Sequence, residues 1–569
     1  MRKIEKGGVL KMKQMKNKKE RGITLIALVV TIIVLIILAG ISINLIFGNL
    51  GIVTKAKEAK TATEIASIKE KIQTEIISKQ AENYGNISDD TLTKILEKYG
   101  KLSDEENLKD KILTTNKGNH KIKVSDIFNG TTKEDDPKEP TFTKVANAPD
   151  LSGFNKDNTN YVSWDLTSSP YTINDSTTIS GTAPSNWYDY TRGVNHWANV
   201  KTTGGGNDCY WVWIPRYAYC ITEGYHTNTA GTIDIKFLQG TTNTPIDGSS
   251  IEIKNQTGSG NWNVHPAFWF DKNDNGIEDK GEQLTGIWVA KYEASSSSVS
   301  EATVTSDLAT TGGGNVTNLQ VRVKPNVTSW RGITVNSIFR VCQNLTEEGN
   351  SLAGGTNLDA HMMKNTEWGA VAYLSRSVYG KNGEVWNNPY YNTTNNSPIT
   401  GLCSNETEET DGKDSGMTDL NRTCKYNDAS GGNASTTGNV YGIYDMAGGA
   451  WEYTAGIYTG GSSDDNRSTL WDNSNAKYVD KYTETTGSIS TYYGNTTKYG
   501  DAVYETSSSG YGDTGSWDSS YSNFPDSSYP VFVRGGRAVS GSSAGVFAFI
   551  NHTGEANTDG SFRPVLYIK

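Results

Sequence analysis

A long uncharged apolar run near the N-terminus is the strongest pattern in this chain. Residues 23–47 contain no ionisable side chain, and only Thr24, Thr31, Ser42 and Asn44 are clearly polar. As a helix the run would be roughly 37 Å long, enough to cross a bilayer. Nine basic and two acidic residues precede it, so the positive-inside rule predicts a single-pass protein of the cell membrane with everything downstream outside. The alternative is a secretory signal peptide.

Helical spacing continues beyond this run. Ile65, Ile68, Ile72 and Ile76 recur at the helical period among Lys and Glu, which predicts an amphipathic stalk. The expected chain is therefore α+β: a leader over 1–22, a transmembrane and stalk helix over 23–85, a small α/β region over 86–130, a Pro- and charge-rich linker over 131–144, and a loop-rich head over 145–569. Within 86–130 we expect a helix at 89–99 and short strands at 111–114 and 120–128.

Short aromatic strands mark the head. Strands are predicted at 210–215, 267–270, 286–293 and 531–534, and helices at 332–345 and 359–374. In the second helix Met362, Trp368, Ala372 and Tyr373 would share a buried side. The chain has 59 Gly, 30 Tyr and 14 Trp, which favours a loop-rich domain with an aromatic core.

Charge and cysteine content narrow the functional classes. The net charge is −10, and removal of the leader, with seven net positive charges, would make it −17, which argues against nucleic acid as a partner. The five cysteines show no CxxC pair. Cys403 with Cys424 and Cys209 with Cys220 are possible disulfides, one thiol such as Cys342 is left over, and the pairing stays open.

Residues 271–282 match the twelve-residue calcium loop position by position. Oxygen ligands would come from Asp271, Asn273, Asn275, Asp279 and Glu282, with the carbonyl of Ile277 at position 7 and Gly276 at the turn. The flanks read as strands instead of helices. We therefore expect a calcium loop outside a helical EF-hand, and the alternative is an acidic hairpin turn with no ion.

The basic leader ending at Gly22, followed by the apolar helix, resembles the type IV prepilin signal. The resemblance implies that a prepilin peptidase cuts between Gly22 and Ile23 and that Ile23 is then methylated. The fifth mature residue of that family is usually Glu, but here it is Ala27. Export and anchoring are thus implied, whereas assembly with pilin subunits into a filament stays open.

Five passages in the head, over 211–215, 363–368, 438–453, 533–536 and 561–566, resemble the formylglycine-generating-enzyme/sulfatase-modifying-factor family, a variant of the C-type lectin fold. Its catalytic members use a cysteine pair near the C-terminus, whereas here no cysteine follows Cys424. The resemblance therefore implies a non-enzymatic chain. It also implies a second structural calcium held by Asp445, Gly448, Ala450 and Glu452; the alternative is that Asp445 and Glu452 cap buried loops through hydrogen bonds.

Non-catalytic members of this fold include the target proteins of diversity-generating retroelements, whose C-terminal segment is mutagenised. The corresponding segment here lies within 534–564. The residues expected to contact a ligand are Arg537, Val539, Ser540, Ser543, Ala548, Ile550 and His552. The sequence thus predicts a pilin-like, membrane-anchored extracellular protein whose head binds a protein or glycan on another cell or a phage. The alternatives are a surface modifying enzyme, a minor pilin, or an ordinary loop and terminal strand at this segment.

Overall fold

The chain divides into two units, Met1–Glu139 and Pro140–Lys569. The computed structural model describes parts of 60–75, residues 89–124 except 106, 109 and 110, residue 127, and residues 145–569 except 274–278, 280, 298–318, 393–396, 405–415, 420–423 and 484–496. The boundary between the units falls inside 131–144, the range in which a linker is expected.

The first unit packs a helix on a small sheet. Helix α3 (Asp89–Tyr99) precedes the antiparallel strands β1 (Gly100–Leu102), β2 (Ile112–Thr115) and β3 (Lys121–Lys123). Leu92, Leu96 and Leu113 are buried between helix and sheet, together with Ile72 from the preceding helical residues. Ile65 and Ile68 pack against the same core, so the helical period seen in the sequence does form one apolar face.

The predicted membrane-spanning architecture is wrong. In the described part of the chain, no helix is long and apolar enough to cross a membrane. The helices with defined bounds have at most 11 residues, or about 16 Å, roughly half a bilayer core, and strands dominate the rest. These findings overturn both the α+β fold class built on a transmembrane stalk and the single-pass location at the cell membrane. The range 23–47, on which both rested, and the processing pair Gly22 and Ile23 lie outside the described residues.

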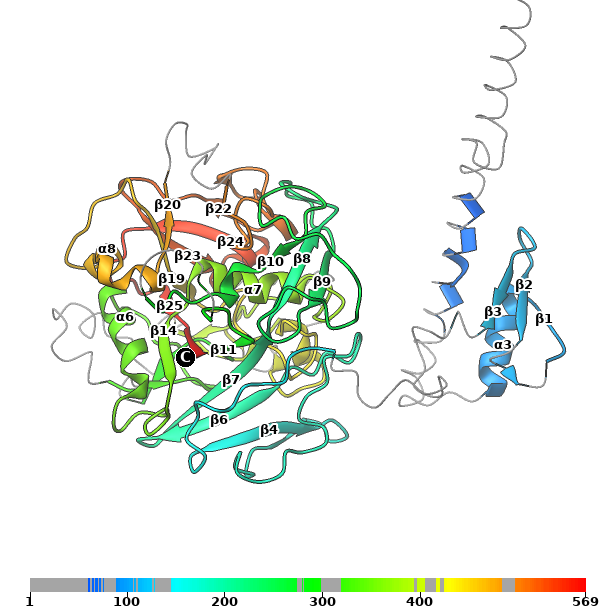
Figure 1. Cartoon of the computed structure of the whole chain (residues 1–569), viewed down its shortest axis with the longest axis horizontal. Coiled ribbons are helices and arrows are strands. Elements are labelled where there is room, and N and C mark those ends of the chain that lie inside the picture. The colour runs from blue at the N-terminus through cyan, green and yellow to red at the C-terminus, as the bar shows by residue number, and fades with distance from the viewer. Residues whose placement is uncertain are drawn as a thin grey trace, which may run out of the picture. The chain divides into compact units, whose positions relative to one another are not determined.

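Two large sheets organise the second unit (Figure 1). The first has the strand order β14-β26-β11-β7-β6-β4-β5, all antiparallel, so that the last strand of the chain is inserted between two earlier ones. Its strands are β4 (Thr159–Asp165), β5 (Thr172–Asn174), β6 (Asn199–Gly204), β7 (Asn207–Pro215), β11 (Gly286–Ala290), β14 (Leu358–Met362) and β26 (Pro564–Ile568).

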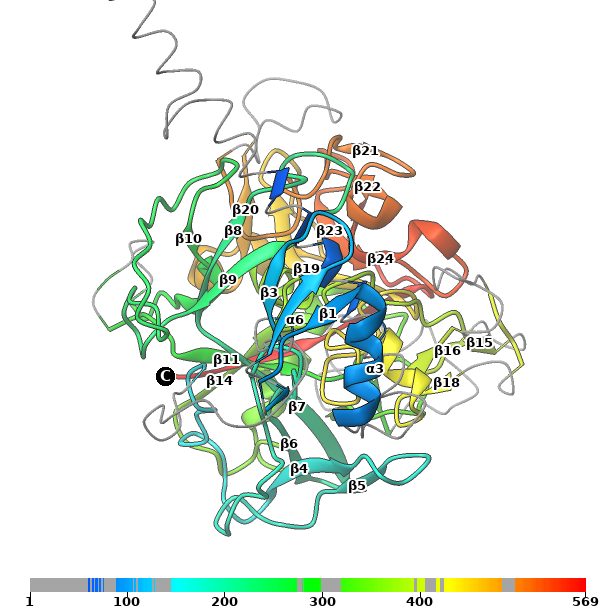
Figure 2. The ribbon, with the colours of Figure 1, turned by 90° about the vertical axis from the view of Figure 1, so that its right-hand side faces the viewer.

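The second large sheet is mixed and has the order β20-β19-β23-β24-β22-β21, with β25 parallel to β19. Figures 1 and 2 both show β19, β23 and β24 side by side. Its strands are β19 (Trp451–Tyr458), β20 (Asp480–Tyr482), β21 (Tyr511–Gly512), β22 (Ser522–Asn523), β23 (Val531–Gly535), β24 (Gly545–His552) and β25 (Gly560–Phe562).

Smaller elements complete this unit. A three-stranded sheet consists of β8 (Tyr217–Ile221), β9 (Ile233–Phe237) and β10 (Asn263–Val264). Two-stranded ladders join β12 (Ser295–Ser296) to β13 (Val321–Arg322), β15 (Tyr391–Asn392) to β16 (Ser397–Pro398), and β17 (Leu402–Cys403) to β18 (Cys424–Lys425). The helices are α6 (Val335–Gln343), α7 (Asn365–Ser375) and α8 (Ser468–Trp471).

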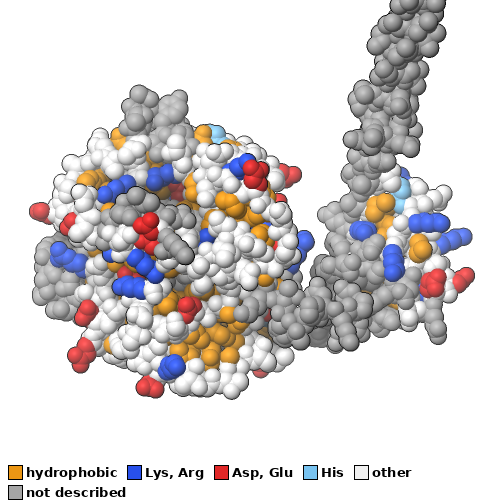
Figure 3. Space-filling view, in the orientation of Figure 1, with side chains coloured by type: hydrophobic (Ala, Val, Ile, Leu, Met, Phe, Trp, Pro, Cys, Tyr) orange, Lys and Arg blue, Asp and Glu red, His pale blue; other side chains and the backbone are white. Residues whose placement is uncertain are grey.

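Aromatic side chains fill the core, as the composition predicts. Eight of the 14 tryptophans are fully buried, among them Trp213 and Trp288, whose rings lie 5.3 Å apart. On the face shown in Figure 3 the surface is mostly uncharged and polar, with hydrophobic patches and scattered charges. Each buried aromatic ring removes a large apolar area from water, which compensates for the low aliphatic content.

Two predicted elements differ from the structure in their first residues. The range 359–374 is not one helix, because Leu358–Met362 pairs with β26 as strand β14 and α7 begins only at Asn365. The amide of Lys364 donates to Glu367 at 2.7 Å and starts the helix there. The predicted strand 267–270 begins instead as a 3-10 turn, Pro266–Phe268, which the imidazole of His265 caps.

Candidate ligand-binding site

A small pocket opens on the second large sheet, beside the C-terminal segment singled out in the sequence. Its volume is about 120 Å³. The residues that line it are Trp451, Tyr453, Val533, Ile550, His552, Asn557, Asp559 and Gly560. Apolar and aromatic side chains come from three adjacent strands, and the polar ones come from the end of β24 and the turn that follows it.

Strand register places the floor of this pocket. Tyr453 of β19 lies opposite Val533 of β23, and Val533 lies opposite Ile550 of β24. Residues directly opposite one another in a sheet project to the same face, as do residues two apart along a strand. Trp451, two residues before Tyr453, and His552, two residues after Ile550, therefore project to this face as well.

The intervening residue, Glu452, projects to the other face and fixes the floor from below. Its carboxylate oxygens accept from Nη2 of Arg563 at 2.6 Å and from Nε at 3.0 Å. Both side chains are buried. Burial raises the pKa of Glu452, and the charge of Arg563 opposes that rise. This two-point ion pair holds β19 in a fixed position relative to the C-terminal strand.

Polar contacts join the pocket floor to its wall. Nδ1 of His552 lies 2.8 Å from the Tyr453 hydroxyl, and Nε2 of the same ring lies 2.9 Å from the side-chain nitrogen Nδ2 of Asn557. Burial lowers the pKa of His552 and raises that of Tyr453 well above its usual value. Both groups are therefore neutral at pH 7, and both ring nitrogens of His552 already have partners.

The loop 553–559 that forms the wall is held at several carbonyls. Tyr453 donates its hydroxyl to Glu555 at 2.6 Å. The amides of Gly332 and Val335 donate to the carbonyls of Asn557 and Gly554 at 2.8 and 3.0 Å. Because the donors lie outside the loop, its backbone is fixed before any ligand binds.

The rim is formed by a tight turn at 537–540. The amide of Ser540 donates to the Arg537 carbonyl at 2.9 Å, and the Arg537 guanidinium forms an ion pair with Asp559 of the pocket. Val539 at the tip of the turn is 40% exposed. The turn and the pocket thus form one continuous surface.

The structure brings most of the predicted contact residues to this surface. Ile550 and His552 line the pocket, Arg537 and Val539 lie on the rim turn, and Ser540 and Ser543 are half-buried at its base. Ala548 is a correction, because it is fully buried and its carbonyl accepts from the Arg534 guanidinium at 3.0 Å. Strand alternation would have placed it beside Ile550, but the register shifts between Arg534 and Gly535.

Six residues that line the pocket were not predicted as contacts from the sequence: Trp451, Tyr453, Val533, Asn557, Asp559 and Gly560. Trp451 and Tyr453 could have been found, because an aromatic residue on each side of Glu452 in a strand predicts a shared aromatic face. Asn557 and Asp559 gave no such signal. Their position depends on how the loop 553–559 is held by distant residues.

In the described part of the first calcium loop, the candidate ligand side chains accept hydrogen bonds from the loop and from Trp269. The Glu282 carboxylate accepts from the indole of Trp269 and the amides of Lys272 and Asp279 at 2.9 to 3.0 Å. Asn273 donates to Asp279 at 2.9 Å, and Asp271 is buried. Asn275 and Ile277 lie outside the described residues. Calcium here stays a prediction, which the melting temperature with calcium and with a chelator would test.

At the second predicted calcium site, the carboxylates of Asp445 and Glu452 accept hydrogen bonds from protein donors. Asp445 accepts from Asn388 at 2.8 Å and from the Gly401 amide at 2.9 Å, while Glu452 is paired with Arg563. Gly448 and Ala450 lie in the same buried loop. Among the described residues no group of three His, Cys, Asp or Glu side chains is placed to hold a metal. These hydrogen bonds are those of the capping alternative, and a calcium ion at this second site stays a prediction.

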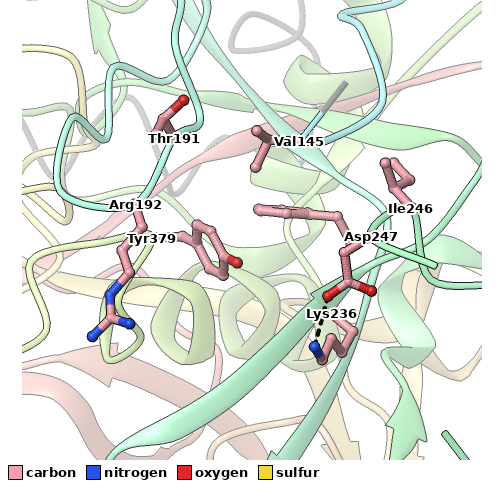
Figure 4. A pocket seen from close by; sticks show the side chains of 8 residues that line it. Val145, Thr191, Arg192, Lys236, Ile246, Asp247 and Tyr379 are labelled. Carbon is pink, nitrogen blue, oxygen red and sulfur yellow. Dashed lines mark hydrogen bonds and ion pairs between the residues drawn. The ribbon is translucent and has the colours of Figure 1, made fainter. Parts of the chain in front are cut away.

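A second cavity, of about 250 Å³, lies between β9 and the turn at Tyr379 (Figure 4). Its charged groups are already partnered in part, because Lys236 and Asp247 form an ion pair at 2.6 Å. Val145, Ile246 and Tyr379 supply apolar walls. This cavity contains none of the predicted site residues.

Comparison with known proteins adds little. No protein-family model matches the chain, and no curated protein matches it. Among solved structures it is similar to Treponema denticola variable protein 1, with 12% identity and a TM-score of 0.21, over 53% of this chain and 91% of that one. A TM-score this low carries neither the fold nor the function of that protein over to this chain. The two family resemblances of the sequence gain no support from family models.

Proposed function

We propose that this chain is a ligand-binding protein, and that the pocket at Ile550 together with its rim turn binds a protein ligand. The observation that carries the proposal is the pocket itself: an aromatic and aliphatic floor with a polar rim on a backbone held in place from outside. Such anchoring pockets, apolar at the centre and ringed by polar groups, are typical of the energetic centres of protein interfaces.

The size of the pocket indicates what enters it. Its volume of about 120 Å³ is well below the range of about 300–1,000 Å³ common for sites that enclose a small molecule. A single protruding side chain of a larger ligand fits this scale. The exposed Val539 and the half-exposed Arg537 would then contact the surface around that side chain.

The charges in and around the pocket favour binding over catalysis. The titratable side chains that line it are Tyr453, His552 and Asp559. Both nitrogens of His552 are engaged, and Asp559 is paired with Arg537. No cysteine lies after Cys424, so the oxidase alternative lacks its C-terminal cysteine pair at this surface.

We further propose that the segment 537–558 is diversified by a retroelement. The support is structural, because residues outside the segment, such as Gly332, Val335 and Tyr453, donate hydrogen bonds to its backbone. Exposed side chains of the segment could therefore change without loss of the fold. Sequencing of the neighbouring DNA tests this idea. An imperfect repeat of the coding segment next to a reverse transcriptase gene is expected, and its absence would remove the proposal.

Binding is tested by capture of proteins from a mixed extract on three immobilised forms of the chain. Wild type is compared with Ile550→Asp, which places a charge in the pocket, and with Leu166→Asp, which places the same charge at a 40% exposed residue of the loop after β4. We expect one or a few proteins to be retained by wild type and Leu166→Asp and lost with Ile550→Asp. Identical sets on all three forms would contradict the proposal.

A further inference from the structure

A cleft of about 580 Å³ lies elsewhere on the same unit; none of the residues predicted to contact a protein or glycan ligand lines it, although Asp271 of the first calcium loop does. Four lysines from three segments converge on it: Lys364 before α7, Lys477 and Lys481 on either side of the start of β20, and Lys498. The aromatic residues Trp269 and Tyr499 also line it. We call this the lysine cleft. Its volume is within the range common for small-ligand sites.

The positive charge of the lysine cleft is not balanced by its own lining. The carboxylates in the lining are Asp271 and Asp480. Oδ2 of Asp480 is engaged at 2.7 Å by the amide of Thr366 in the first turn of α7. Two lining carboxylates therefore face four lysines, and one of the two, that of Asp480, already accepts a hydrogen bond from the first turn of α7.

Two of the lysines have no ion pair with a carboxylate within the described ranges. Nζ of Lys481 lies 3.4 Å from the neutral side-chain oxygen of Asn473, and Nζ of Lys498 lies 4.9 Å from the ring centre of Tyr482. In contrast, Nζ of Lys364 lies 3.7 Å from the carboxylate oxygen Oε1 of Glu367 and forms an ion pair with it. Lys481 and Lys498 are half-buried, so their charges are partly shielded from solvent and their field is concentrated in the cleft.

This arrangement is unusual for a chain with a net charge of −10. Like charges held together in a concave surface repel one another and destabilise the free protein, and they raise the local concentration of an anionic ligand. Neutral hydrogen-bonding groups, Asn255 and Gln283, and the two aromatic rings complete the lining. Such a mixed lining suits a ligand with many hydroxyl groups and apolar ring faces in addition to its anionic groups.

We infer that the lysine cleft binds an oligosaccharide that carries carboxylate or sulfate groups. Lysine is suited to this role because its ammonium is a compact point charge that does not demand a planar, bidentate partner. The inference is independent of the pocket at Ile550, because the two sites share no lining residue.

The test is calorimetric titration of the full chain with tetrasaccharides at low salt. A heparin-derived sulfated tetrasaccharide and a galacturonate tetrasaccharide distinguish the two anionic groups, and maltotetraose is the neutral comparison. We expect at least one anionic tetrasaccharide to bind, maltotetraose not to bind, and added salt to weaken binding. Absence of binding by both anionic sugars would overturn the inference, as would equal binding of pentaglutamate or inorganic phosphate.

The variants locate the site. Lys481→Gln with Lys498→Gln should weaken binding by roughly tenfold or more, since each ammonium lost removes a charge-assisted contact. Lys236→Gln with Lys254→Gln removes the same charge from lysines already paired with Asp247 and Glu252, and should leave the affinity unchanged. Equal losses in both pairs, or none in the first, would overturn the inference.

Hydrogen exchange of the wild-type chain gives a result that does not depend on the folding of a variant. The sulfated or galacturonate sugar should protect amides in 477–481 and 498–499. Protection elsewhere, with none in these ranges, would place the site outside the lysine cleft. Capture of a protein ligand at Ile550 should be unaffected by the cleft variants, so failure of one proposal is distinguishable from failure of the other.

Discussion

The hydroxyl of Tyr453 lies 2.8 Å from Nδ1 of His552, although β23 separates the strands that carry the two residues. The same hydroxyl donates to the carbonyl of Glu555 at 2.6 Å. One phenol therefore joins the floor of the pocket to the side chain that walls it and to the loop that follows. The shape of the candidate site depends on this link.

Tyr453→Phe should loosen the wall of the pocket. The variant removes only the hydroxyl, so Nδ1 of His552 and the Glu555 carbonyl each lose a partner, and we expect a loss of about 1–2 kcal/mol in the free energy of unfolding. Denaturant titration measures the loss, and hydrogen exchange should accelerate at amides 553–559. Tyr511→Phe, at a tyrosine that is 58% exposed, should stay within about 0.5 kcal/mol of wild type. Unchanged exchange in the loop would show that the link does not order it.

Removal of either Glu452 or Arg563 alone should lower the free energy of unfolding strongly, because the remaining charge would be buried without its partner. Glu452→Gln leaves the Arg563 guanidinium buried without its counter-charge, which is expected to cost about 3–5 kcal/mol. Glu452→Leu combined with Arg563→Met should cost less than the sum of the single changes, because no charge is left buried. Additive costs in denaturant titrations would show that the two side chains do not act as a pair.

The stability of the second unit should fall as the pH rises above about 6.5. His361 is buried, with Nδ1 2.9 Å from Asp359 and Nε2 2.9 Å from Glu367. Burial alone would lower the pKa of His361, but the two carboxylates outweigh it and raise the pKa to about 9. A raised pKa means that the folded state binds the proton more tightly, so the stabilisation is complete below pH 6.5 and is lost through pH 9.

The same network predicts an acid limit. Burial opposes ionisation of Asp359 and Glu367, but His361 and neighbouring donors lower the pKa of each to about 2. Their stabilisation is present above their ordinary pKa values and is lost as the pH falls towards 2. Melting temperatures from pH 3 to 10 should decline at both ends for wild type. In His361→Gln the decline between pH 6.5 and 9 should be reduced, and an unchanged alkaline decline would assign it to other groups.

Cys403 and Cys424 should form a disulfide under oxidising conditions. All five cysteines are free thiols in the structure, but these two are directly opposite in the antiparallel pair β17 and β18. Opposed residues in such pairs have Cα atoms about 4.5–5.5 Å apart, within the range a disulfide spans. Closure of the intervening loop is expected to stabilise the chain by about 3 kcal/mol.

Peptide mapping after mild oxidation checks this bridge, with the melting temperature as the second measurement. Cys424→Ser is the control and should show no rise in melting temperature. Cys209 and Cys220 lie on strands of different sheets, so the bridge between them considered from the sequence is not expected. Recovery of that pair, or of no pair, would contradict the prediction.

Much of the head was predictable from local pattern, and the failures have physical causes. The apolar runs at 210–215, 286–293 and 531–534 contain β7, β11 and β23 in large part, because buried strands need such runs. Leu358–Met362 was mistaken for helix because its pairing partner, β26, is about 200 residues away in the sequence. Ile550 and His552 were named because they lie in the C-terminal segment that corresponds to the mutagenised one, whereas the burial of Ala548 next to a register shift leaves no trace in composition.

The most direct test of the binding proposal is site-specific photo-cross-linking in a mixed protein extract. A photoreactive amino acid replaces Val539 on the rim in one form and Leu166 in the other, and both positions are 40% exposed. The proposal predicts a discrete protein adduct at position 539 that excess unlabelled wild type suppresses and excess Ile550→Asp does not. Equal adducts at positions 539 and 166, no adduct at 539, or equal suppression by Ile550→Asp would contradict it.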